Sequence, residues 1–308
     1  DRSFFFATFL SWVRLMIITP PAMKNLVLTL ATLLFVSAVF AQDDGFHLEK
    51  DYLIGKTGVV DLRSSDARVF VTGSKRSTAH VKIDREITAN GWTWGEEDFH
   101  LTVEEENGNL SIREKENGSH MNVIGYYHEE YRIEIEVPEG VSLTVRGDDG
   151  DYYIKNVNGS IVLNLDDADA ELVDCKGANY RFSIDDGDIR MEGGSGKLEV
   201  TGDDADIEIH KAHFSTVYVK LDDGDLILET SLADSGEYSI ETQDGAVALD
   251  ITAGGGAFNI HHDDTHVITE GNFTTLSENE RETHIFLPNG SSKVTVGAGD
   301  ARIRLSAN

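Results

Sequence analysis

Apolar and polar residues alternate over much of the chain between residues 140 and 250. In a typical run, Ile161, Leu163 and Leu165 occupy every second position. A further run begins a few residues later, with Ala170 and Leu172 at its apolar positions. Because successive side chains of a β-strand point to opposite faces, a period of two indicates strands with one buried face. The pattern therefore predicts pairs of short β-strands joined by brief turns.

An acidic turn of the form Asp-Asp-Gly/Ala-Asp separates the two runs and occurs five times at a nearly constant interval. The copies begin at Asp148, Asp166, Asp185, Asp203 and Asp222, and a degenerate copy begins at Gln243. Units this short bury their apolar face only by stacking on one another. We therefore predict an all-β fold, a single-domain parallel β-solenoid with coils of about 18–19 residues. An antiparallel meander in a barrel or sandwich is the alternative.

Both ends of the chain also contain the pattern. Asp66-Ala67-Arg68 and Asp300-Ala301-Arg302 precede matching alternating runs, which predicts an early coil and a final coil. Residues 73–131 depart from the repeat, and we expect longer strands and hairpins there, forming an irregular N-terminal cap region. Residues 252–283 form a second irregular insertion. Four aromatic residues of the first insertion are expected to pack the solenoid end, with stacking on sugar rings as the alternative: Trp92, Trp94, Tyr126 and Tyr127.

The N-terminal part resembles an export signal. Met23 and Lys24 precede an apolar run from Leu26 to Phe40, and small residues stand at the −3 and −1 positions of a cleavage site after Ala41. We expect residues 1–22 to be an upstream extension, 23–41 a signal peptide and 42–308 the β-solenoid domain. An uncleaved membrane anchor is the alternative. The mature chain holds no further stretch of membrane-spanning length. The protein is therefore expected to be exported to the periplasm, the cell surface or the medium.

The composition limits the kinds of molecule that the protein is expected to bind. The chain has 55 acidic and 26 basic residues, a formal net charge of −29. Such a surface repels nucleic acids and anionic membranes. Its 40% hydrophobic residues suffice for a folded core. The single cysteine, Cys175, excludes a disulfide within the chain.

The segment from Tyr131 to Gly140 leads into an alternating strand and a Gly-Asp turn, and such turns recur up to Gly299-Asp300. In these features the chain resembles the bacterial putative-adhesin family of unknown function, whose members are β-strand-repeat proteins. The resemblance covers nearly all of the mature chain. It implies an exported β-solenoid at the cell envelope without established catalytic residues. This chain differs in having three aspartates per turn instead of one.

The aspartates are the most unusual feature. Equivalent residues of neighbouring coils lie about 4.8 Å apart, and two unit charges at that spacing repel by about 0.9 kcal/mol even in water. Calcium, which binds six to eight oxygen ligands, would offset this repulsion. A solvated acidic edge that blocks edge pairing is the alternative. The candidate calcium ligands are the aspartates of the five turns: Asp148, Asp149, Asp151, Asp166, Asp167, Asp169, Asp185, Asp186, Asp188, Asp203, Asp204, Asp206, Asp222, Asp223 and Asp225.

Other candidate chemistry is sparse. The group His261, His262, Asp263, Asp264 and His266 has zinc- and copper-binding side chains, but adjacent residues of a strand point to opposite faces, so we expect a solvated loop. Cys175 has no nearby partner in a known catalytic spacing, and no phosphate-binding loop, nucleophile elbow or metalloprotease motif occurs.

We therefore predict a non-catalytic cell-envelope or surface protein that uses a rigid acidic β-solenoid as an adhesion or interaction scaffold. Its partner would be an envelope protein, an extracellular protein or a glycan, with no nucleic acid involved. The alternative is a calcium-dependent, lyase-like carbohydrate-active enzyme, in which a basic residue beside clustered acids abstracts a proton. Arg181 and Lys220 are outward candidates for that residue, but neither recurs with a consistent acidic neighbour.

Overall fold

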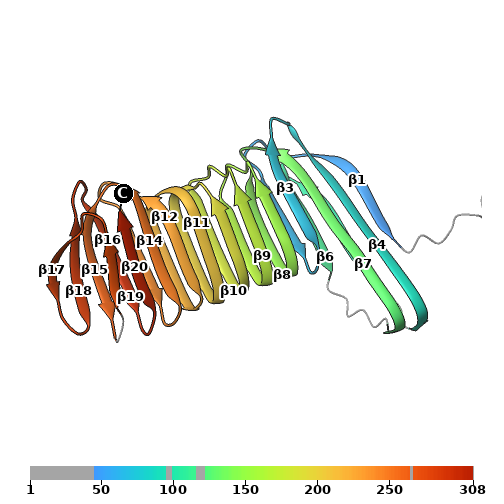
Figure 1. Cartoon of the computed structure of the whole chain (residues 1–308). Helices are drawn as coiled ribbons and strands as arrows, with labels where there is room; N and C mark the ends of the chain where they lie inside the picture. Colours follow the sequence, from blue (N-terminus) through green and yellow to red (C-terminus); the bar gives the residue numbers. More distant parts are fainter. Residues whose placement is uncertain (1–44, 95–98, 116–121, 264–265, 308) are drawn as a thin grey trace, which may run out of the picture. The chain divides into compact units, whose positions relative to one another are not determined.

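The chain forms β-strands in the part that the structure describes. This computed structural model covers residues 45–94, 99–115, 122–263 and 266–307, drawn in colour in Figure 1. Its regular secondary structure there consists of twenty strands, which confirms the predicted all-β class. The described residues contain no helix that is long and apolar enough to cross a membrane. The predicted upstream extension and signal peptide lie outside the described residues.

Within the described residues the fold contains eight coils. Each coil has two β-stretches, which we call legs, one before and one after the position of the acidic motif. The first coil is formed by β2 (Val59–Ser64) and β3 (Arg68–Ser74). The strands of the other seven coils, in chain order, are β8 (Ser142–Lys155), β9 (Ile161–Val173), β10 (Asn179–Glu192), β11 (Ser195–Asp223), β12 (Asp225–Ser231), β13 (Glu237–Thr242), β14 (Ala246–Ala253), β19 (Ser292–Ala298) and β20 (Arg302–Ala307).

Neighbouring coils pair in parallel and in register (Figure 1). Leu163 lies between Val145 of the preceding coil and Phe182 of the next, and the side chains of all three are buried. The offset in sequence between these partners equals the interval of the acidic motif. The predicted parallel solenoid is therefore confirmed, and the antiparallel meander does not describe these coils.

Each coil bends at the acidic motif. In β9 the buried side chains stand at odd-numbered positions up to Leu165 and at even-numbered positions from Ala168 onward. The change occurs because Asp166 and Asp167 are consecutive and both exposed. The sequence predicts a separate turn here, whereas β8, β9, β10 and the first part of β11 bend within a continuous strand. In the other coils two separate strands flank the motif, as predicted. Two legs can thereby bury their apolar faces against the same core.

The third position of the motif is small because the backbones of stacked coils approach one another there. Gly187 has a φ of 124°, and a Cβ atom on it would lie 2.6 Å from the carbonyl oxygen of Ala168. At Gly224, with a φ of 118°, the corresponding distance to the carbonyl oxygen of Ala205 is 2.2 Å. A side chain at either glycine would strain the backbone and push neighbouring coils apart.

Aromatic side chains fill part of the core between the two legs. The ring of Tyr180 packs edge to face on Phe182 and Phe214, with centroid distances of 6.2 and 5.9 Å. Its hydroxyl group donates a hydrogen bond to the backbone oxygen of Cys175 at 2.8 Å. Burial raises the pKa of Tyr180. The coils thus share one continuous core in which a buried polar atom is satisfied.

At the N-terminal end, the first coil in sequence is not the outermost coil in space. Strand β2 pairs with β6, and β3 pairs with β7, on the side away from β8. Antiparallel strands then extend each sheet: β5 on β6, β4 on β7, and β1 on β4 (Figure 1). The strands of this end are β1 (Phe46–Leu53), β4 (Thr78–Trp94), β5 (His100–Glu106), β6 (Asn109–Lys115) and β7 (Asn122–Pro138). The predicted irregular region, residues 73–131, covers β4, β5, β6 and the first part of β7, whereas β1 lies outside it.

At the C-terminal end, too, the last coil in sequence is not the outermost coil in space. The final coil, β19 and β20, is hydrogen-bonded to β13 and β14 on one side and to β15 and β16 on the other. Strand β18 pairs antiparallel with β15, and β17 with β18. These strands form the second predicted insertion and are β15 (Gly256–His262), β16 (Val267–Glu270), β17 (Thr274–Glu278) and β18 (Glu282–Leu287).

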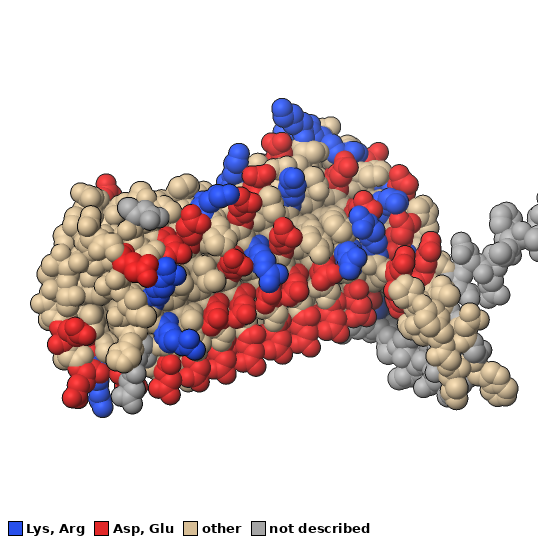
Figure 2. Space-filling view, viewed as in Figure 1, with Lys and Arg blue, Asp and Glu red and all other residues tan. Residues whose placement is uncertain are grey.

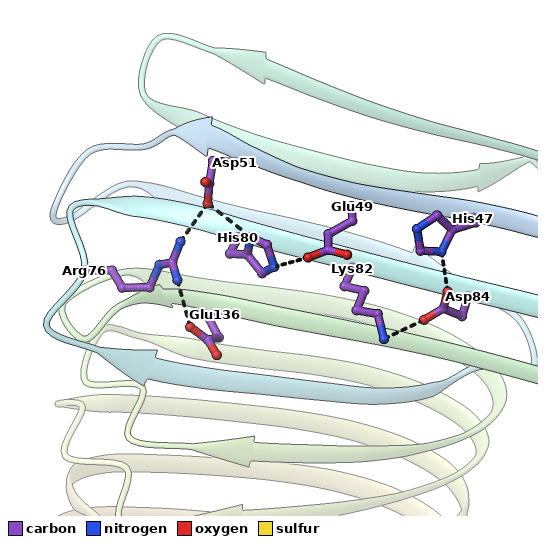
Figure 3. A network of polar contacts seen from close by, with 8 residues as sticks. All are labelled: His47, Glu49, Asp51, Arg76, His80, Lys82, Asp84 and Glu136. Atoms are coloured by element: carbon purple, nitrogen blue, oxygen red, sulfur yellow. Dashed lines mark hydrogen bonds and ion pairs between the residues drawn. The ribbon is translucent and has the colours of Figure 1, made fainter.

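Ion pairs connect the outer strands of the N-terminal end (Figure 3). The guanidinium group of Arg76 contacts Asp51 of β1 at 2.6 Å and Glu136 of β7 at 3.0 Å. On β4, Lys82 contacts Asp84 at 2.9 Å, and its hydrogen bond contributes most to lowering the pKa of that carboxyl. Isolated exposed pairs contribute little to stability, but a network that crosses three strands also fixes their register.

Candidate functional site

The aspartates of the five acidic motifs form three parallel columns along one edge of the coils. Figure 2 shows them as a row of acidic side chains below the coils. In the column of second positions, Asp149 pairs with Asp167, Asp167 with Asp186, and Asp186 with Asp204. The structure therefore brings together side chains that lie a whole coil apart in the sequence. We call this set of columns the acidic ladder.

The second column is longer than the sequence analysis predicted. Asp66 of the first coil extends the column at one end, where Asp148 and Asp149 repel its carboxylate. At the other end, Asp244 contacts Asp223, and the register of the final coil with β13 and β14 places Asp300 beside Asp244. The sequence analysis did not include these three aspartates among the candidate ligands, because each stands in a motif without the other two. Their position before the second apolar run is the signal that identifies them.

The fourth position of the motif has a structural role. The backbone N–H of Asp188 donates to Oδ1 of Asp169 at 2.9 Å, and the N–H of Asp225 donates to Oδ1 of Asp206 at 2.8 Å. Both donors follow a glycine with positive φ, Gly187 or Gly224. At Gly187 the regular pairing of β10 with β9 is interrupted. The aspartate of the preceding coil thus replaces a hydrogen bond that the sheet ladder does not provide.

The first and second positions carry unfavourable electrostatics. The pKa values of Asp185, Asp186 and Asp223 are raised above 3.8, first by partial loss of hydration and then by the carboxylates of neighbouring coils. The same causes, in the same order, raise the pKa of Asp66. Raised carboxyl pKa values mean that the folded state disfavours the ionised forms. The ladder therefore lowers stability at neutral pH in these two columns.

A cleft of about 650 Å³ opens where the ladder meets β7. Asp66 and Asp149 line it together with Arg68 and Arg132. The Nε atom of Arg68 contacts Asp151 at 3.1 Å, so a cation stands at the first coil where later coils have the fourth aspartate. The cleft thus combines several carboxylates with two arginines, and its charge is mixed.

The ladder differs from a typical calcium shell. Among the residues that the structure describes, no group of three or more His, Cys, Asp or Glu side chains surrounds a point where one metal ion could bind. The carboxylates stand in lines, and Asp169 and Asp206 already accept backbone hydrogen bonds. A calcium ion with six to eight oxygen ligands would need groups from neighbouring coils and water. Calcium binding by the fifteen aspartates stays a prediction.

The histidine group near residue 262 does not converge on one point. His261 contacts Glu282 at 3.6 Å, whereas His262 is hydrogen-bonded to the hydroxyl group of Thr283 at 3.0 Å. Asp263 and His266 are exposed. Asp264 lies outside the described residues. The two adjacent histidines thus have different partners, as expected for residues on opposite faces of a strand. Both stand in β15 and not in a loop, so the expected solvated loop is wrong for these two residues.

The remaining reactive candidates have ordinary surroundings. Cys175 is buried, its Sγ lies 3.7 Å from the backbone oxygen of Ile154, and burial raises the pKa of the thiol. A buried neutral thiol is a poor nucleophile. Arg181 is exposed and contacts Glu199 at 3.2 Å, and Lys220 is also exposed. Neither basic residue lines the acidic cleft.

The expectation that the N-terminal aromatic residues pack the solenoid end is wrong for those whose side chains are described. Trp92 is 81% exposed, Tyr126 57% and Tyr127 43%. They lie where β4 and β7 pair beyond the strands of the first coil. The side chain of Trp94 is not among those that the structure describes. The side chains of Trp92 and Tyr126 are thus more than half exposed, whereas the hydroxyl group of Tyr127 donates a hydrogen bond to Glu129 at 2.6 Å.

An all-β parallel solenoid with inserted strands at both ends and an acidic edge defines the class of this protein. The family model described as Toastrack DUF4097 matches residues 59–298, and the chain belongs to that family. The matched residues include all strands from β2 to β19. A comparison with curated proteins gave no match.

Three of the solved structures that match the chain come from different bacteria. A putative adhesin from Bacteroides fragilis has 13% identity and a TM-score of 0.50, over 84% of this chain and 97% of that one. A putative adhesin from Parabacteroides merdae has 12% identity and a TM-score of 0.33, over 83% and 95%. A putative cell adhesion protein from Clostridium sporogenes has 10% identity and a TM-score of 0.28, over 85% and 100%. At these identities, the likeness to the first concerns the fold.

Proposed function

We propose that the protein is an exported, non-catalytic scaffold of the cell envelope or cell surface. The in-register core carries this proposal, because it holds outward side chains in fixed columns along the coils. Such a surface presents repeated groups to a large partner. The description of the similar Bacteroides fragilis structure as a putative adhesin supports the same interpretation.

Export is the first requirement of this function. A signal peptide over residues 23–41 would direct the chain across the membrane, and the coils would then fold outside the cytoplasm. A disulfide-free core suits either redox environment, since Cys175 is buried and reduced.

The test is to express the chain with a C-terminal tag in a bacterial host and to separate the cytoplasmic, envelope and extracellular fractions. We expect a processed protein outside the cytoplasm, beginning at Gln42 in mass spectrometry. Ala41→Glu removes the small residue at the −1 position and should leave the precursor uncut. The neighbouring change Phe40→Leu is the matched control and should be processed normally. An unprocessed cytoplasmic protein would contradict the proposal.

The cleft between the acidic ladder and β7 favours one second candidate, a calcium-dependent carbohydrate-active enzyme. A lyase needs a basic residue beside clustered acids, and Arg132 has that position in the cleft. The test is incubation with polygalacturonate and millimolar calcium, with ultraviolet detection of unsaturated sugar products. Product that disappears in Arg132→Ala would establish the enzyme. If no unsaturated product forms, the enzyme candidate is rejected and the scaffold remains the proposed function.

A further inference from the structure

The paired ends of β4 and β7 form an uncharged ribbon in a strongly charged protein. These strands pair antiparallel without interruption from His80 and Glu136 to Trp94 and Asn122. Residues 87–94 and 122–127 contain no Asp, Glu, Lys or Arg, although 26% of the chain is charged. In Figure 2 the corresponding region is a protrusion without charged side chains. We call these two segments the aromatic ribbon.

One face of the aromatic ribbon is directed away from the core. In β7 the buried side chains stand at odd-numbered positions, among them Ile133 and Ile135, so even-numbered residues face outward. Trp92 is paired with Ile124, and these side chains are 81% and 67% exposed. Tyr126, two residues along, is 57% exposed on the same face. Large apolar side chains that cluster in the open mark an interaction surface.

Polar groups alternate with these rings on the same outward face. Asn90 is paired with Tyr126, and Thr88 with His128. Side chains two residues apart on a strand lie about 7 Å from each other. The face therefore presents an indole and a phenol ring beside an amide, a hydroxyl and an imidazole group over roughly 14 Å.

This chemistry matches a sugar polymer without charge. A pyranose ring has an apolar face of C–H groups that stacks on an aromatic ring, and its hydroxyl groups pair with amide and hydroxyl side chains. A lipid surface would leave the side chains of Asn90 and Thr88 without hydrogen-bond partners in an apolar medium, which is costly. It would also bury His128 together with its partner Glu130, whose carboxylate lies 3.3 Å from Nε2 of the imidazole. In the absence of calcium, anionic polymers are repelled by the net charge of −29, and so is a second copy of this chain.

We propose that the outward face of the aromatic ribbon binds neutral polysaccharide chains, with Trp92 and Tyr126 as stacking platforms and Asn90, which is paired with Tyr126 and stands two residues from Trp92, as the hydrogen-bonding group. This inference rests on the proposed scaffold function and specifies its partner. It places the binding site at the N-terminal end, where His128 also lines the cleft between the acidic ladder and β7. The ladder then needs no ligand for the protein to attach to a glycan.

The test is isothermal titration of the purified full chain with three neutral hexasaccharides, of β-1,4-glucose, β-1,3-glucose and β-1,4-mannose, and with hexagalacturonate as the anionic comparator. We expect at least one neutral hexasaccharide to bind and hexagalacturonate not to bind. Trp92→Ala should weaken binding at least tenfold, and Asn90→Ala several-fold. Tyr218→Ala removes a half-exposed ring from the coil surface and is the matched control, which should bind like the unmodified chain.

Several outcomes would overturn the inference. These are no binding to any neutral hexasaccharide, binding that is unchanged in Trp92→Ala, Trp92-dependent binding to phosphatidylcholine vesicles instead, or Trp92-dependent dimerisation in sedimentation velocity. Because Trp92 is exposed, its substitution should leave the melting temperature unchanged, which separates lost binding from lost folding. A processed protein outside the cytoplasm that fails these titrations would retain its scaffold function without this partner.

Discussion

Two aspartates of the same coil should respond in opposite ways to the same substitution. Asp206→Ala removes the carboxylate that accepts the backbone hydrogen bond of Asp225 at 2.8 Å. Asp204→Ala removes a carboxylate that is paired with Asp186 and repels its neighbours. Both changes remove one negative charge from an exposed position of the acidic motif. Their difference therefore isolates the hydrogen bond from the electrostatic relief.

The size of the effect follows from the exposure of the pair. A hydrogen bond to a charged group contributes roughly 1.5–3 kcal/mol, and solvent access reduces this to about 1 kcal/mol here. For a domain of this size, about 1 kcal/mol corresponds to a change in melting temperature of roughly 2–4 °C. Asp206→Ala should thus melt about 2–4 °C below the unmodified protein. Asp204→Ala should melt at the same temperature or higher.

The assay is thermal unfolding followed by circular dichroism at pH 7, at a fixed ionic strength of about 0.15 M, where charges are screened over about 8 Å. A chelator removes traces of divalent ions, so that calcium does not contribute. Asp206→Asn keeps an acceptor oxygen and should recover most of the loss. Equal melting temperatures for the two alanine variants, or the reverse order, would refute the distinction between the second and fourth positions.

Further predictions concern the core, the ladder and pH. Leu163→Asp places a carboxylate in the closed core and should lower the melting temperature strongly or abolish cooperative unfolding. Asn164→Asp, one residue away on the outer face, should change the melting temperature little. Similar melting temperatures for the two variants would refute the assigned register. If the ladder binds calcium, millimolar calcium should raise the melting temperature above that in sodium chloride of matched ionic strength, and the gain should shrink when three aspartates of one motif become asparagine: Asp185, Asp186 and Asp188. A melting temperature that does not respond to calcium would exclude calcium binding by the ladder. Because the ladder carboxyls have raised pKa values in the folded state, their destabilisation is present at pH 7 and is relieved as the pH falls through those values toward 3.8. The raised pKa of His210, caused first by its hydrogen bond to Glu208, acts in the same direction, since its stabilisation is lost as the pH rises through the folded-state value. A melting temperature that falls steadily on acidification from pH 7 to 5 would contradict this sign.

The sequence was sufficient for the repeating part of the fold. A period of two determines which face of a strand is buried, and the constant interval of the acidic motif determines the register of neighbouring coils. Leu163 could therefore be placed between its equivalents in the two adjacent coils. The bend within each strand was also visible, as the change of apolar positions on either side of Asp166 and Asp167, although it was interpreted as a turn.

The ends of the solenoid and the roles of single aspartates were not predictable in the same way. Alternation identifies a strand's faces but not its hydrogen-bonded neighbour, so nothing local indicates that β6 and β7 pair on the outer side of the first coil. For the same reason, the exposed position of Trp92 was missed, because its strand pairs beyond the strands of that coil. The hydrogen bonds of Asp169 and Asp206 depend on a glycine conformation in the next coil, which composition alone does not reveal.

The placement of the last coil has a mechanical consequence. Strand β20 is the last described strand of the chain, yet it is hydrogen-bonded to β14 on one side and to β16 on the other. A force applied to the chain just after β20 must therefore break two parallel ladders at once. An outermost coil at the end of an ordinary repeat array could instead peel from a single neighbour. A tether attached there would resist pulling until the strands of the C-terminal end yield together.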